Sequence, residues 1–230
     1  MVLQERIGTR SNFIENSDHL IFEQDSDRKK LLIVFAYINQ TLGTRSHSNF
    51  LRHIDCKKLF LNPGLSQWYQ TGVPGVASSY SGLLAFLQDV KTSFYDHEIL
   101  CLGHSMGAFP ALGIGVGVGA DRILASGPEI ILNTPGSLSI RHLGSTPLEC
   151  GDLTPVLSSN SKSSITVLVG KQNAFDMRVA RRLGEFPRTE IIELGTGHNT
   201  FPYLKDVGKL GAVLEAFVEG GDLRSLVANA

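Results

Sequence analysis

One stretch of the sequence decides the fold: Leu100-Cys101-Leu102-Gly103-His104-Ser105-Met106-Gly107-Ala108. A short apolar run, residues 99–102, leads into Gly-His-Ser-Met-Gly, and a second apolar run that contains glycines follows at 108–120. The pattern predicts a strand, a sharp turn and a helix, with Ser105 in a strained conformation at the turn. Glycines two residues before and two residues after the serine leave room for the strand and the helix to cross.

This arrangement is typical of a serine nucleophile. We expect the Ser105 hydroxyl to project from the carboxyl edge of a sheet. The next amide, that of Met106, lies at a helix N-terminus and is expected to face a developing oxyanion. The alternative is a Gly-rich turn whose serine only caps the following helix.

Composition narrows the class of protein. The chain has 230 residues, 42% of them hydrophobic and 19% charged, which suits one large domain with a sizeable core. Its 21 Lys and Arg residues nearly balance its 22 Asp and Glu residues, so no charged field indicates a nucleic-acid or basic partner. Three cysteines, an odd number, do not make a disulfide framework and favour a reducing compartment.

The N-terminal sequence has no apolar core of a signal peptide, and no apolar run reaches the roughly 18 residues of a membrane span. We therefore expect a cytoplasmic protein without a membrane span. The alternating glycines at 113–119 resemble a phosphate-binding loop, but they have no lysine and do not lie between a strand and a helix start. Close packing of a helix explains them better.

Short apolar runs alternate with amphipathic stretches, which predicts an α/β fold: a mainly parallel, twisted sheet with helices on both faces. Strands are expected at 20–22, 31–36, 59–61, 99–102, 123–125, 165–169 and 191–194, and helices at about 83–94, 108–120, 175–183 and 210–217. The segment 129–162 is rich in Ser, Thr, Pro and Gly and lacks apolar periodicity. We interpret it as a lid-like, loop-like excursion from a single domain, 1–230, with no large cap domain.

A serine nucleophile needs a base, and the base needs an acid that orients it. On a parallel sheet both are expected at the carboxyl ends of strands. His198 follows the last strand in a glycine-flanked loop, and Asp176 follows the strand at 165–169. Histidine suits the role because its ordinary pKa of about 6.5 lets it accept and return a proton near neutrality.

Other roles remain open for these residues. Asp176 begins a helix, so its alternative role is a first-turn charge, and Asp152 and Glu129 in the excursion are the alternative acids. His104 is expected to point away from the site and to pack. The other histidines show no ligand spacing, so we expect no metal site.

The chain order Ser105, Asp176, His198 resembles that of the α/β-hydrolase superfamily, and the similarity covers roughly residues 31–218. The resemblance implies an acyl-enzyme on Ser105. It also implies that a backbone amide of the loop after the first central strand joins that of Met106 in an oxyanion hole.

In this family the loop often carries His-Gly, whereas here it reads Phe35-Ala36-Tyr37-Ile38-Asn39. Because the donor is a backbone amide, the different side chains need not abolish it. We expect the amide of Tyr37 to fill the role, with that of Ala36 as the next choice.

A finer resemblance links the chain to bacterial O-acetyltransferases and esterases associated with cell-surface polysaccharides. It rests on Trp68-Tyr69 with Gly72 and Gly75, on the Gly-His-Ser-Met-Gly stretch, and on Gly127-Pro128-Glu129. Since loops at the carboxyl ends of strands form pockets, Trp68 and Tyr69 are expected to wall the substrate site; the alternative is that they are packed loop aromatics.

Three functions follow from these patterns. The favoured one is a serine esterase that hydrolyses a small-molecule or glycan acyl ester and needs no cofactor. The second is an O-acyltransferase that uses acetyl-coenzyme A as co-substrate and a sugar hydroxyl as acceptor. The third is a catalytically silent member of the fold that acts by binding.

Overall fold

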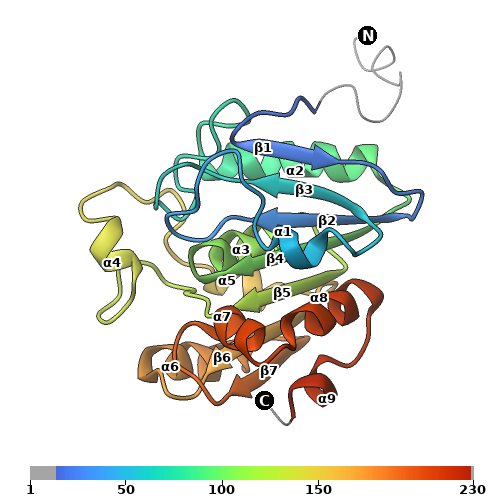
Figure 1. Ribbon diagram of the computed structural model, residues 1–230. Coiled ribbons are helices and arrows are strands. Elements are labelled where there is room, and N and C mark those ends of the chain that lie inside the picture. The colour runs from blue at the N-terminus through green and yellow to red at the C-terminus, as the bar shows by residue number, and fades with distance from the viewer. Residues whose placement is uncertain (1–13, 229–230) are drawn as a thin grey trace.

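The computed structural model describes residues 14–228, which are arranged around a seven-stranded sheet (Figure 1). The strands are β1 (Leu20–Glu23), β2 (Lys30–Phe35), β3 (Lys57–Leu61), β4 (Glu98–His104), β5 (Arg122–Ser126), β6 (Ser164–Gly170) and β7 (Thr189–Leu194). They lie in the order β1-β3-β2-β4-β5-β6-β7. β1 pairs antiparallel with β3, and the other neighbouring pairs are parallel, which confirms the predicted sheet.

Helices cover both faces of this sheet (Figure 1). One face carries α2 (Tyr80–Ser93), α3 (Ala108–Gly117), α5 (Thr154–Ser158) and α6 (Ala174–Leu183), and the other carries α1 (Ser48–Leu51), α7 (Thr200–Asp206), α8 (Leu210–Glu219) and α9 (Leu223–Val227). Successive side chains of a strand point to opposite faces. In β2, Leu31 and Ile33 therefore join the first core cluster, whereas Leu32 and Val34 join the second.

The glycines of α3 are packing residues, as predicted. A Cβ on Gly113 would lie 2.3 Å from the Tyr80 hydroxyl oxygen, and one on Gly115 would lie 2.9 Å from the Ile123 side chain. Glycine inside a helix costs about 1 kcal/mol relative to alanine. Close contact with α2 and with the sheet offsets that cost and holds the helix that follows Ser105.

The segment 129–162 is more ordered than the predicted loop. It contains α4 (Ser139–His142) and α5, and its base is closed by two backbone hydrogen bonds, from the Leu132 amide to Gly151 (2.8 Å) and from the Leu153 amide to Ile130 (2.8 Å). The apolar side chains Leu132, Leu143, Leu153 and Leu157 are buried although they follow no regular period. α4 projects beyond the edge of the sheet at which the parallel strands end (Figure 1).

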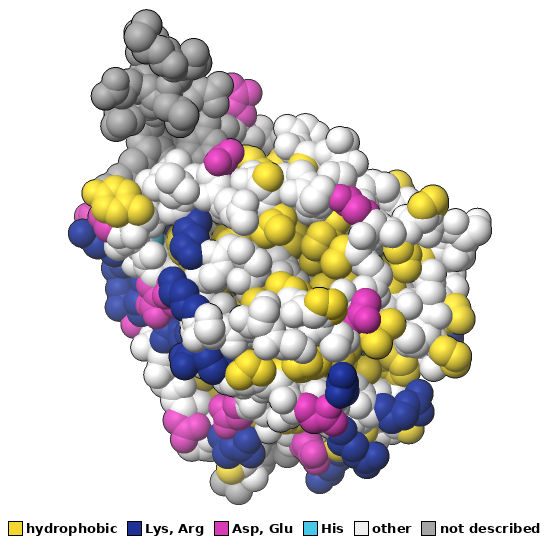
Figure 2. Space-filling model, turned by 180° about the vertical axis from the view of Figure 1, so that it is seen from behind, with side chains coloured by type: hydrophobic (Ala, Val, Ile, Leu, Met, Phe, Trp, Pro, Cys, Tyr) yellow, Lys and Arg dark blue, Asp and Glu magenta, His cyan; other side chains and the backbone are white. Residues whose placement is uncertain are grey.

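The face seen in Figure 2 carries charges of both signs. Lys and Arg side chains lie along one edge and at the lower right, with Asp and Glu among them, and hydrophobic side chains show at the centre. None of the helices within residues 14–228 is both long and apolar enough to cross a membrane.

Candidate active site

The turn at Ser105 has the predicted strained geometry. β4 ends at His104, Ser105 has a positive φ of 52°, and a short 3-10 turn, Ser105–Gly107, leads into α3. A Cβ on Gly103 would lie 2.0 Å from the carbonyl oxygen of Gly107. Only glycine therefore allows the strand and the helix to cross this closely, and the strand–turn–helix prediction is confirmed.

The turn also presses against the end of β2. A Cβ on Gly107 would lie 2.5 Å from the Phe35 carbonyl oxygen and 2.7 Å from that of Ala36. The chain after β2 is thus held beside the turn that carries the Met106 amide. The amides of Tyr37 and Ala36 are the two predicted to join that of Met106 in an oxyanion hole. The Ala36 N–H already donates a hydrogen bond to the Leu61 carbonyl (3.0 Å). Of the two, the Tyr37 amide is therefore the candidate donor for an oxyanion.

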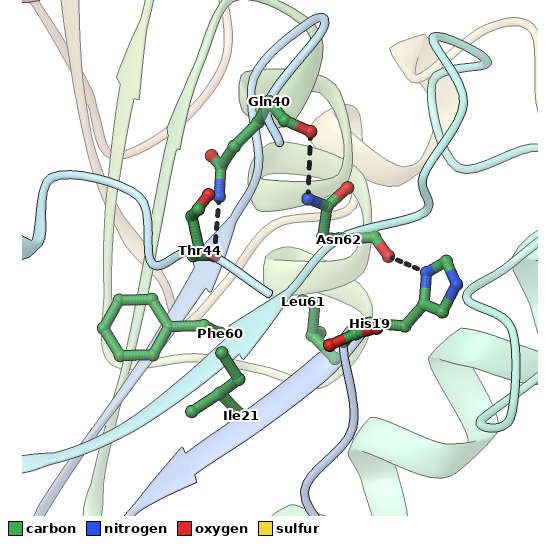
Figure 3. A pocket seen from close by; sticks show the side chains of 8 residues that line it. His19, Ile21, Gln40, Thr44, Phe60, Leu61 and Asn62 are labelled. Carbon is green, nitrogen blue, oxygen red and sulfur yellow. Dashed lines mark hydrogen bonds between the residues drawn. The ribbon is translucent and has the colours of Figure 1, made fainter. Parts of the chain in front are cut away.

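The loop that follows Tyr37 is tied to β1 and β3 by a polar network around a small hollow (Figure 3). The Asn62 carbonyl contacts His19 Nδ1 (2.9 Å), and the Asn62 side-chain amide donates to the Gln40 carbonyl (3.3 Å). Gln40 Nε2 donates to the Thr44 carbonyl (3.0 Å). These polar groups satisfy one another, so we assign the network to fixing the loop rather than to binding a ligand.

Ser105, His198 and Asp176 form an unbroken hydrogen-bonded chain. The Ser105 hydroxyl lies 2.9 Å from His198 Nε2, and His198 Nδ1 lies 2.9 and 3.1 Å from the two carboxylate oxygens of Asp176. An ionised carboxylate only accepts hydrogen bonds. When Asp176 is ionised and His198 neutral, Nδ1 therefore carries the proton, and Nε2 accepts that of Ser105. Ser105 and Asp176 are buried, whereas the His198 side chain is 19% exposed.

Two neighbouring loops bring the acid and the base together. A Cβ on Gly170, at the end of β6, would lie 1.8 Å from the Gly197 carbonyl oxygen. The Gln172 amide donates to the Thr196 carbonyl (2.9 Å). Asn173 then caps α6, since its Oδ1 accepts from the amides of Phe175 (2.9 Å) and Asp176 (3.2 Å). The Asp176 carboxylate is therefore left free to face His198.

The two alternative acids have other partners. Asp152 is exposed and accepts from the Thr154 amide (2.7 Å) at the start of α5. Glu129 is buried, and its Oε1 accepts from the amides of Leu138 (2.7 Å) and Ser139 (3.0 Å). Burial raises the pKa of Glu129, an effect that those hydrogen bonds and the nearby charge of His198 oppose. Of the three predicted acids, Asp176 is the one hydrogen-bonded to His198.

Trp68 and Tyr69 lie in the core rather than at a pocket wall. Both side chains are 0% exposed, and the Tyr69 hydroxyl donates to the Leu61 carbonyl (2.8 Å). The prediction that they wall a substrate pocket is wrong for this structure. Both side chains belong to the first core cluster, so the alternative, packed loop aromatics, is the one that the structure shows.

This geometry is suited to nucleophilic acyl chemistry. A hydroxyl, a base that can take its proton and an acid that holds the base meet at the carboxyl ends of parallel strands. Within residues 14–228, no group of three or more His, Cys, Asp or Glu side chains is placed to hold a metal ion.

No family model and no curated protein matches this sequence, whereas solved structures match its fold. An esterase from Exiguobacterium antarcticum superposes with a TM-score of 0.62 at 11% identity, over 87% of this chain and 95% of that one. A Bacillus subtilis carboxylesterase gives 0.58 at 13% identity, over 89% and 88% of the two chains. A lidless α/β serine hydrolase from Xanthomonas campestris gives 0.53 at 14% identity, over 87% and 88%.

Proposed function

We propose that this chain, which has the α/β-hydrolase fold, is a serine hydrolase that cleaves carboxylic esters through an acyl-enzyme on Ser105. The observation that carries the proposal is the continuous chain from Ser105 through His198 to the buried carboxylate of Asp176. Each link has the length of an ordinary hydrogen bond. A serine at a turn and a histidine in a loop have no structural need of such an alignment.

In the first half of the reaction, Ser105 Oγ attacks the ester carbonyl carbon while His198 Nε2 takes the hydroxyl proton. The negative charge that develops on the carbonyl oxygen is met by the amides of Met106 and Tyr37. Asp176 stabilises the imidazolium that forms and holds its orientation. The tetrahedral species then collapses, the bond to the leaving alkoxide breaks, and His198 returns the proton to that oxygen. This leaves the acyl group on Ser105 and a free alcohol.

In the second half, water replaces the alcohol. His198 takes a proton from the water as it attacks the acyl carbonyl, and returns it to Ser105 Oγ when the acid leaves. The proton that leaves with the alcohol is replaced by one from water, and His198 carries both, so hydrolysis needs no cofactor. A small-molecule or glycan acyl ester fits this scheme.

The same acyl-enzyme can instead be formed from acetyl-coenzyme A and discharged by a sugar hydroxyl. That reaction requires the acceptor to be held and water to be kept out. We favour hydrolysis because water reaches a partly exposed base such as His198 without a dedicated site.

Hydrolysis of p-nitrophenyl acetate tests the proposal. Wild type is expected to release nitrophenol and Ser105→Ala to lose that activity, whereas Ser163→Ala removes another buried serine hydroxyl, next to the amino end of β6, and serves as the matched control. Equal rates for wild type and Ser105→Ala contradict the assignment. Incubation with acetyl-coenzyme A and a glycan panel, read by mass spectrometry, separates the acceptors: an acetylated glycan favours transfer over hydrolysis.

A further inference from the structure

His104, the residue just before the nucleophile, lies in a buried side-chain relay. Its Nδ1 is 2.8 Å from the Ser126 hydroxyl at the end of the neighbouring strand β5. The Ser126 hydroxyl in turn hydrogen-bonds the Thr200 hydroxyl at the start of α7. All three side chains are buried: His104 is 7% exposed, and Ser126 and Thr200 are 0% exposed. The relay thus links two strand ends to the segment that follows His198.

A second contact joins His104 to the same segment. Its ring stacks on Phe201, with centroids 5.3 Å apart and planes 18° from parallel. Thr200 is tied directly to the base, because its amide donates to the His198 carbonyl (2.9 Å). His104 is therefore linked to two successive residues of α7, to Phe201 directly and to Thr200 through Ser126.

The chain before His198 is held by a different partner, the loop that carries Asp176. The Gln172 amide donates to the Thr196 carbonyl (2.9 Å), and Gln172 Nε2 donates to that of Gly195 (2.9 Å). The relay adds a separate attachment on the other side of His198, because it ties the segment that follows the base to the ends of β4 and β5.

We propose that His104 is a positioning residue for His198, which acts through Ser126 and Thr200 to keep the base aligned with Ser105. The catalytic consequence rests on the proposed hydrolase function. His104 itself takes no proton from the substrate. Every contact it makes along the relay runs to the framework that carries the base.

The chemistry of His104 suits this role. Burial, helped by the charges of His47 and His198, lowers the pKa of His104 to about 3, so its ring is neutral near pH 7. A neutral ring 6.0 Å from His198 does not repel the imidazolium that forms there during catalysis. It also keeps one donor and one acceptor nitrogen, which lets Nδ1 pair with a hydroxyl in either direction.

Steady-state kinetics with p-nitrophenyl acetate give the first readout. Thr200→Val keeps the branched shape but removes the hydroxyl, and we expect kcat to fall on the order of tenfold to a hundredfold with KM little changed, as for a misplaced catalytic group. Thr200→Ser keeps the hydroxyl and is expected to retain most of kcat. Ser126→Ala should behave like Thr200→Val, whereas its control Ser163→Ala, another fully buried serine, should behave like wild type.

The downfield proton NMR signal of His198 Nδ1–H, bonded to Asp176, gives a readout that needs no turnover. We expect it to broaden or move upfield in Thr200→Val and in His104→Phe, which keeps the ring that stacks on Phe201. A signal and a kcat unchanged in both folded variants overturn the proposal. If wild type shows the signal but no esterase activity, the hydrolase assignment fails, while the signal in the variants still decides the relay.

Discussion

The turn between β6 and α6 and the excursion after β5 each place a buried carboxyl group beside the same histidine, and only one of them contacts it. Asp176, from the turn, directs both of its oxygens at His198 Nδ1. Glu129, from the excursion, lies close enough for the charge of His198 to lower its pKa. Its Oε1, however, accepts hydrogen bonds from the amides of Leu138 and Ser139.

The difference lies in what satisfies the backbone around each acid. In the turn, the Asn173 side chain caps α6 and accepts from the amide of Asp176 itself, so the carboxylate is not needed there. In the excursion, the Glu129 carboxylate itself accepts from the two amides where α4 begins. A buried acid near a catalytic base is therefore available to that base only when another residue satisfies the local amides.

The largest expected effect separates the two acids directly. Asp176→Asn should lower kcat on the order of 10⁴-fold, because the amide no longer holds the histidine in the required tautomer. Glu129→Gln should keep most of kcat, because its side-chain oxygen can still accept from the two amides. Kinetics of p-nitrophenyl acetate hydrolysis compare them. The opposite ranking would transfer the role of acid to the excursion.

The next largest effect is expected where the loop after β6 meets the loop that carries His198. Gly170→Ala introduces a Cβ 1.8 Å from the Gly197 carbonyl oxygen, so the loops must separate. We expect a loss of about 1–3 kcal/mol in the free energy of unfolding, as for overpacking, together with a marked fall in kcat. Gly197→Ala is the matched control, since its Cβ meets open space and its φ is not positive. Urea denaturation measures the free energy of unfolding of both variants, and steady-state kinetics measure their kcat. If the two variants have the same stability and the same kcat, the junction does not hold Asp176 and His198 together.

Removing the cap of α6 tests the idea that Asn173 frees Asp176. Asn173→Ala should cost about 1 kcal/mol of stability and should also lower kcat, because the Asp176 carboxylate is then drawn to the uncapped amides. Asp222→Ala removes a similar side-chain cap from α9, at the amides of Arg224 and Ser225. It should cost a similar stability and leave kcat unchanged. If neither variant loses kcat, the idea that Asn173 frees Asp176 is contradicted.

The smallest effect is a pH dependence of stability. Because burial raises the pKa of Glu129 above its ordinary 4.5, the folded protein holds this proton to higher pH than the unfolded chain. The associated stability is present below pH 4.5 and is lost as pH rises to the raised pKa of the folded state. The free energy of unfolding of wild type, relative to Glu129→Gln, should fall over that window and then level off. If the free energy of unfolding of wild type relative to Glu129→Gln instead rises with pH, the folded state stabilises the ionised Glu129 carboxylate and the prediction is wrong.

Sequence reasoning predicted the sheet and the grouping of three residues at its edge because both follow from local patterns. Buried strands are continuous apolar runs, and the order of Ser105, Asp176 and His198 places each residue just after a strand. It missed α1, α4, α5, α7 and α9, which have 4, 4, 5, 7 and 5 residues and are too short to show a helical period. For Trp68 and Tyr69 the pocket-wall prediction is wrong and the alternative, packed loop aromatics, is confirmed. The sequence left both open because the exposure of loop aromatics depends on which way the loop turns.

The relay shows a further limit. Ser126 and Thr200 are 74 residues apart, and each is an ordinary hydroxyl in the sequence. A polar residue at the end of an apolar strand, as at Ser126 after Ile123-Leu124-Ala125, is the one local pattern that sets it apart. That Thr200 is the partner of Ser126 depends on the order of the strands in the sheet, which no local pattern gives.

Labelling with a fluorophosphonate tests the central claim most directly, because an activated serine attacks the reagent and keeps a stable covalent adduct that mass spectrometry detects. We expect wild type to gain one adduct, located by peptide mapping on Ser105. Asp176→Asn should label far more slowly, and Ser105→Ala should not label. An adduct on another residue, or equal labelling of wild type and Ser105→Ala, would contradict the account.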